Sequence, residues 1–192
     1  MKRVIVSGIL GGIALFVWGV LSHMVLPGGY VGIQALPNEQ AVLSVVQTSI
    51  HEPGLYVFPG SAAMNEIQKK AASGPIHGML VFHSGVGGLT AGRLVNGFIL
   101  NLVQGWLAAL LLSWAWAAVA RSYTSRVAFV TLVGIFGLLT MNIEYWNWMG
   151  FPADYTLAHI VNRSIGFLVV GLVVAGVLKK QAVPVGAAVA SA

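Results

Sequence analysis

The chain has 192 residues, of which 57% are hydrophobic and only 8% are charged. Soluble globular domains carry about 25% charged residues, so this composition excludes an ordinary soluble domain. The formal charge of +5 does not indicate nucleic-acid binding, because most basic residues flank apolar runs and no basic patch with interleaved aromatic residues occurs. The chain has no cysteine, which excludes disulfide exchange, cysteine-ligated zinc and iron–sulfur clusters within it.

Four apolar runs are each long enough to cross a bilayer, which needs about 20 helical residues. They predict an α-helical membrane protein, a four-transmembrane-helix bundle with a small extracytoplasmic α/β insert between helices 1 and 2. The first run is longer than a usual signal-peptide core and no A-x-A site follows it, so we expect a retained anchor. The predicted spans are 1–26, 94–120, 127–147 and 157–178, and the insert covers 27–93.

Positive charges predict the orientation of the spans. The basic residues beside them are Lys2 and Arg3, Arg121 and Arg126, and Lys179 and Lys180. Loops on the cytoplasmic side of a membrane carry an excess of Lys and Arg. Both termini, including the tail 179–192, are therefore expected to be cytoplasmic, and the insert is expected on the other side.

The predicted insert repeats a short pattern. In each half a helix-like run with an Asn-Glu pair is followed by an Ile-His pair and then by a β-rich string, LYVF at 55–58 and MLVF at 79–82. The pattern predicts an αβαβ element; if the strands are parallel, the helix at about 62–72 is the crossover between them. Two strands alone are marginally stable, so we expect this layer to rest on the bundle or on a partner. The glycine-rich turn that follows matches no phosphate-binding motif, and Thr90 is expected to cap the second span.

Small residues in the first two spans are spaced for close helix packing. Such stripes either pack the bundle together or form a docking face for another subunit. They comprise Gly8 and Gly12, and Gly97, Asn101, Gly105 and Ala109.

Polar side chains gather near the predicted outer ends of the spans. Glu144 and Arg163 lie in the third and fourth spans, which form a tight hairpin. An ionisable group inside a span is costly and usually has a partner, so we predict that these two residues pair. The predicted polar cluster around them comprises Asn96, Asn142, Asn147 and Asn162. All five histidines are expected outside or at this boundary: His23, His51, His77, His83 and His159.

Several kinds of site remain open for these residues. Glu144 and Arg163 can clamp the hairpin while the histidines lie at the interface. The histidines can instead bind a metal such as Zn²⁺ or Cu²⁺, although no H-x-x-x-H or H-E-x-x-H spacing occurs. A b-type haem between His23 and His159 is a further alternative. A solute or ion path would use Asn96, Asn101, Gln104, Asn142, Glu144 and Arg163.

Four strings resemble those of a family of small bacterial four-pass inner-membrane proteins with no known activity. They are SHMVLP (22–27), LPNEQAVL (36–43), PGLYVFPG (53–60) and EYWNWMGFP (144–152). The resemblance spans most of the chain. It implies a multi-pass protein of the bacterial inner (cytoplasmic) membrane with an exported loop, and it carries over no activity or catalytic residue.

These observations favour a non-enzymatic role, because no nucleophile elbow, P-loop or paired-Asp signature is present and no catalytic residue can be named. The leading hypothesis is an accessory subunit or assembly factor of a larger inner-membrane complex. Its partners would be the lipid bilayer and either other membrane subunits or a second copy of the chain. One alternative is a small metal- or haem-binding redox protein that uses the outer-face histidines, and a second is an oligomeric transporter of a small solute or ion.

Overall fold

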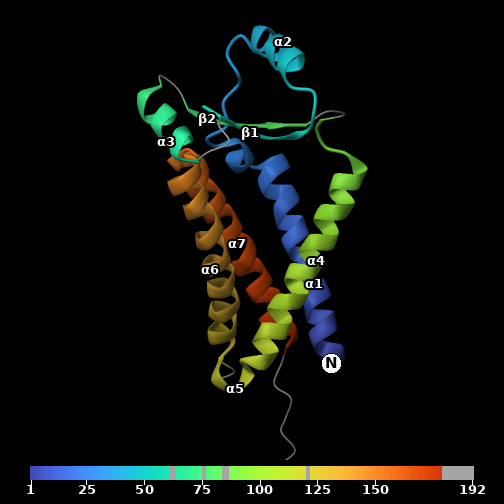
Figure 1. Cartoon of the computed structure of the whole chain (residues 1–192). Coiled ribbons are helices and arrows are strands. Elements are labelled where there is room, and N and C mark those ends of the chain that lie inside the picture. The colour runs from blue at the N-terminus through green and yellow to red at the C-terminus, as the bar shows by residue number, and fades with distance from the viewer. Residues whose placement is uncertain (61–63, 75–76, 84–86, 120–121, 179–192) are drawn as a thin grey trace, which may run out of the picture.

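The computed structural model of the chain describes residues 1–60, 64–74, 77–83, 87–119 and 122–178. It is mostly helical, with a small two-stranded sheet, as the sequence predicts (Figure 1). Arg121 and the predicted tail 179–192, with Lys179 and Lys180, lie outside the described residues. Four helices are long and apolar enough to cross a membrane: α1 (Lys2–Val20) with its continuation to Val25, α4 (Ala91–Trp114), α6 (Tyr123–Met149) and α7 (Ala153–Val177).

Polar caps and a glycine fix several helix ends. Thr90 accepts a hydrogen bond from the backbone N–H of Arg93 at 3.3 Å, which confirms the predicted cap of α4. Ser122 caps α6 in the same way, accepting from the N–H of Ser125 at 3.0 Å. At its other end α6 stops at Gly150, whose φ of +73° lies in the left-handed region that favours glycine at helix C-termini.

Three helix ends lie four residues or more from those that hydropathy indicates, and one of them is the start of α6, at Tyr123 rather than at Val127. α7 begins at Ala153 rather than at Leu157, because Asp154 in the first turn suits the positive end of the helix dipole although it is not apolar. α4 ends at Trp114, and the short helix α5 (Trp116–Val119) follows it towards α6. Side chains near the start of α7 therefore lie deeper in that helix than the hydropathy pattern indicates.

The four long helices form two antiparallel pairs. The most extensive contacts join α1 to α4 and α6 to α7, and α1 also packs on α7. Contacts between α4 and α6 are few, and Figure 1 shows these two helices apart at the end where α4 begins. The bundle is thus closed on the α1–α7 side and open between α4 and α6.

Glycines let α1 and α4 approach closely. A Cβ atom added to Gly12 would lie 2.5 Å from the Cα of Leu102, and one added to Gly8 would lie 2.6 Å from the Cα of Trp106. Gly105 faces them from α4, where a Cβ would lie 2.7 Å from the Cα of Gly12. Because backbone meets backbone here, the predicted packing role of these three glycines is confirmed.

The insert keeps the predicted order of helix, strand, helix and strand. Phe58 lies opposite Gly78 in an antiparallel pair, so the connection leaves and re-enters the sheet at the same end. The condition for a crossover, parallel strands, is therefore not met, and α3 lies in a connection that starts and ends at the same end of the sheet. The elements are α2 (Glu39–Ser49), β1 (Gly54–Phe58), α3 (Met64–Ser73) and β2 (Gly78–Phe82).

The insert lies at the end of the bundle opposite the N-terminus (Figure 1). Its first residues are tied to α7 at Gly32, whose φ is +76°. A Cβ atom there would lie 2.5 Å from the Cβ of Tyr155, so only glycine fits both the backbone conformation and the space. This contact anchors the start of the insert, while the sheet and α2 lie farther along the chain.

Candidate functional site

Two cavities lie on either side of α4. One, of about 460 Å³, is bounded by α1, α4 and α7; the other, of about 490 Å³, is bounded by α4, α6 and α7. We call them the α1 cavity and the α6 cavity. Gln104 and Arg163 line both, so the polar centre of the bundle is shared between them. Both volumes fall in the range of about 300–1,000 Å³ that is typical of ligand pockets.

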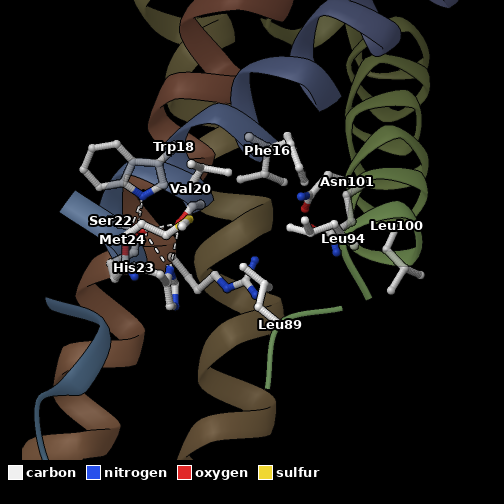
Figure 2. Close-up of a pocket in the computed structure, with 16 residues that line it drawn as sticks. Phe16, Trp18, Val20, Ser22, His23, Met24, Leu89, Leu94, Leu100 and Asn101 are labelled. Atoms are coloured by element: carbon white, nitrogen blue, oxygen red, sulfur yellow. Dashed lines mark hydrogen bonds between the residues drawn. The ribbon is translucent and has the colours of Figure 1, made fainter. Parts of the chain in front are cut away.

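A set of hydrogen bonds fixes one wall of the α1 cavity (Figure 2). The indole N–H of Trp18 donates to the backbone oxygen of Asn162 at 3.0 Å and to its side-chain oxygen at 2.9 Å. In the π-helical turn Leu21–Val25, the hydroxyl of Ser22 and the Nδ1 of His23 both contact the carbonyl oxygen of Gly19, at 3.2 and 2.9 Å. When Nδ1 donates to that carbonyl, the Nε2 atom of His23 is the acceptor of the ring.

Aromatic contacts orient His159 in the α6 cavity. Its ring lies against Tyr155 with the centroids 4.3 Å apart. Tyr155 in turn contacts Phe151 at 5.6 Å, and Phe151 stacks on Tyr145 at 5.4 Å. This row of rings links the end of α6 to the start of α7 and holds one polar wall of the cavity in place.

Two of the four residues of the predicted polar cluster line the cavities, one in each. Asn162 lines the α1 cavity and Asn142 lines the α6 cavity, where its amide donates to the carbonyl oxygen of Leu138 at 2.9 Å. Asn96 and Asn147 are exposed and line neither cavity. The sequence pattern placed all four at one level, but helix rotation directs only two of them to the cavities.

Glu144 and Arg163 form no ion pair or hydrogen bond with each other in the part of the chain that the structure describes. Both are exposed. Glu144 precedes the end of α6 by five residues and Arg163 follows the start of α7 by ten, so they lie about 8 and 15 Å from that end of the hairpin at 1.5 Å per residue. Hydropathy indicates that α7 starts at Leu157. With that start, Arg163 would lie only about 9 Å from the helix end, closer to the level of Glu144. Their pairing stays a prediction.

The histidines are spread over the molecule. His51, His77 and His83 are exposed in the insert. His23 and His159 lie within electrostatic range of each other but line different cavities. Among residues 1–60, 64–74, 77–83, 87–119 and 122–178, no group of three or more His, Asp or Glu side chains could hold a metal ion. A metal or haem at the histidines stays a prediction.

Sequence reasoning missed the contact between Trp18 and Asn162. The available signal was the position of Trp18, 16 residues after the start of α1, where its N–H needs an acceptor inside the bundle. Which helix supplies that acceptor depends on the pairing of α1 with α7, which hydropathy does not give. Comparison with protein-family models, curated proteins and solved structures finds no match for the chain.

Proposed function

We propose that the chain is a non-enzymatic accessory subunit or assembly factor of a larger membrane complex, and that its insert is the docking surface. The proposal includes the orientation expected from the basic residues: both termini in the cytoplasm of a bacterial cell and the insert outside the inner membrane. The carrying observation is the unpartnered apolar surface of the sheet and α2.

One face of the sheet is apolar and exposed. Leu55 and Val57 share this face because side chains alternate along a strand, and Val81 joins them because it lies opposite Leu55. Their exposed fractions are 62%, 48% and 75%. Contiguous apolar side chains outside the membrane-spanning helices are typical of a protein-contact surface.

The helices of the insert do not cover this surface. α2 has no buried residue, and its side chains Val42, Leu43 and Val45 are exposed. Within the described residues, neither α2 nor α3 packs extensively on another element, and β1 and β2 contact mainly each other. A two-stranded sheet with an open apolar face is marginally stable in water. The lack of covering contacts within the described residues therefore supports the proposal that a partner binds this surface.

The test is native mass spectrometry of the full chain, purified from its host in a mild detergent. We expect a stoichiometric complex for the wild-type chain. The double variant Leu55→Gln/Val81→Gln should have a dissociation constant for that complex at least tenfold higher. Ile33→Gln, an exposed apolar position of the insert outside the sheet and α2, is the matched control and should leave the complex intact. A lone monomer of the wild-type chain would refute the proposal.

A redox protein that binds metal or haem is the second candidate. It is favoured by His23, whose Nδ1 contact with Gly19 leaves Nε2 available as a ligand, and by the nearness of His159. Metal analysis and an optical spectrum of the same preparation distinguish the two functions. A stoichiometric metal or a Soret band that His23→Ala removes would favour this candidate over the first.

A further inference from the structure

We propose that the α6 cavity binds a long-chain carboxylate. The guanidinium group of Arg163 would hold the carboxylate, and the apolar inner half of the cavity would hold the alkyl chain. This ligand site does not depend on the proposed docking function of the insert.

The first argument is charge. Arg163 lies about 15 Å along a membrane-spanning helix, at 1.5 Å per residue, and the described part of the chain gives it no hydrogen bond or ion pair. Neither cavity has an Asp or Glu among the described residues that line it, and the neighbouring His159 cannot supply negative charge. A cation at this depth is costly without a counter-charge. An anionic ligand would provide one.

The second argument is the separation of polar and apolar lining along the α6 cavity. His159 lies about 9 Å from the start of α7, and Asn142 lies about 10 Å from the end of α6, where the two helices are joined. Arg163 lies deeper, about 15 Å from the start of α7. Leu111 on α4 and Val130 on α6 lie roughly 30 Å from the corresponding helix ends. This order matches an amphiphile with its head towards the insert and its chain towards the opposite side of the bundle.

The third argument concerns the kind of head group. A guanidinium group binds a carboxylate through two parallel hydrogen bonds, which a neutral head group cannot reproduce. A carboxylate is also small, and moving it below the headgroup region displaces less polar surface than moving a phosphoglycerol group. The volume of about 490 Å³ suits one alkyl chain rather than the two of a phospholipid.

Two glycines allow each cavity to be filled separately. Gly137 lines the α6 cavity and Gly97 lines the α1 cavity. A Cβ atom added at either position would meet no atom within 4 Å. Gly137→Leu and Gly97→Leu are therefore a matched pair: each adds side-chain volume at a position that lines one cavity, and its Cβ atom meets no neighbouring helix.

The experiment measures binding of radiolabelled oleate to the full chain, purified in an uncharged maltoside detergent. We expect saturable binding of one oleate per chain. Unlabelled methyl oleate and dioleoyl phosphatidylglycerol should not displace it at concentrations where unlabelled oleate does. Gly137→Leu should abolish binding, while Gly97→Leu should leave the dissociation constant unchanged.

Charge variants complete the test. Arg163→Gln should weaken oleate binding at least tenfold, and Arg163→Lys, which keeps the charge, should bind more tightly than Arg163→Gln. Arg93→Gln is the control, because Arg93 lines neither cavity and donates to the carbonyl oxygen of Gly88 at 2.8 Å. Size-exclusion profiles show which variants fold, and the paired glycine variants decide the outcome if an Arg163 variant does not.

Four results would overturn the proposal. Equal displacement by methyl oleate would show that the head group is not recognised, and equal displacement by dioleoyl phosphatidylglycerol would assign the site to a phospholipid. Unchanged binding in a folded Arg163→Gln variant would remove the role of the cation. Equal loss of binding in the two glycine variants would show that the alkyl chain does not occupy the α6 cavity specifically.

Discussion

The two sides of α4 are built differently. Towards α1, Gly105 meets the backbone of Gly8 and Gly12 with no space for a side chain. Towards α6, the contacts are few and Gly137 faces open space. Lipid tails are as apolar as the helices, so helices in a membrane associate where their backbones pack closely rather than wherever they are hydrophobic. A glycine therefore marks a contact only where a neighbouring helix reaches it.

The largest expected effect comes from filling the closed side. Gly105→Ala should destabilise the folded chain by about 3 kcal/mol, at the upper end of the usual cost of overpacking, because the new methyl group meets backbone rather than a flexible side chain. The measurement is the thermal unfolding midpoint in detergent. Gly97→Ala, on the same helix but in open space, is the control, and it should raise the midpoint slightly rather than lower it. If both variants melt like the wild type, α1 and α4 do not pack at these glycines.

A smaller effect is expected from the contact that joins the two helix pairs. Trp18→Phe keeps an aromatic ring but removes the five-membered ring with the N–H that bonds Asn162, and we expect the lost hydrogen bond to cost about 1 kcal/mol, as for other hydrogen bonds between membrane helices. A double-mutant cycle with Asn162→Ala measures the coupling between the two side chains. Additive effects of the two substitutions would contradict the bond to the side-chain oxygen of Asn162, because Asn162→Ala leaves the backbone acceptor in place.

The smallest effect, of opposite sign, is expected on the open side. Gly137→Ala should stabilise the chain by about 0.5–1 kcal/mol, because alanine loses less backbone entropy than glycine in a helix and the added methyl group meets no atom. The same thermal unfolding assay applies. A clear loss of stability would show that α6 is packed at this point and that the cavity is closed.

Much of the architecture could be predicted from hydropathy, because each span must be apolar over its own length. The depth of Arg163 could not, since α7 begins with Asp154 and Tyr155, which are not strongly apolar but are stabilised by the helix terminus and by neighbouring rings. The pairing of α4 with α1 rather than α6 depends on which glycines meet across space. The spacing of Gly97, Gly105 and Gly137 along the chain does not reveal this, and so the cavities could not be foreseen.

The division of the spans into two helix pairs has a consequence for the covalent chain. α1 with α4 and α6 with α7 each form a hairpin, and the contact of α1 with α7 joins them. The second and third long helices, α4 and α6, have few contacts with each other. Few of the described contacts therefore join the two long helices on either side of the link between α5 and α6. Two polypeptides separated at this link and produced in the same cell should reassemble into a split protein through the α1–α7 contact.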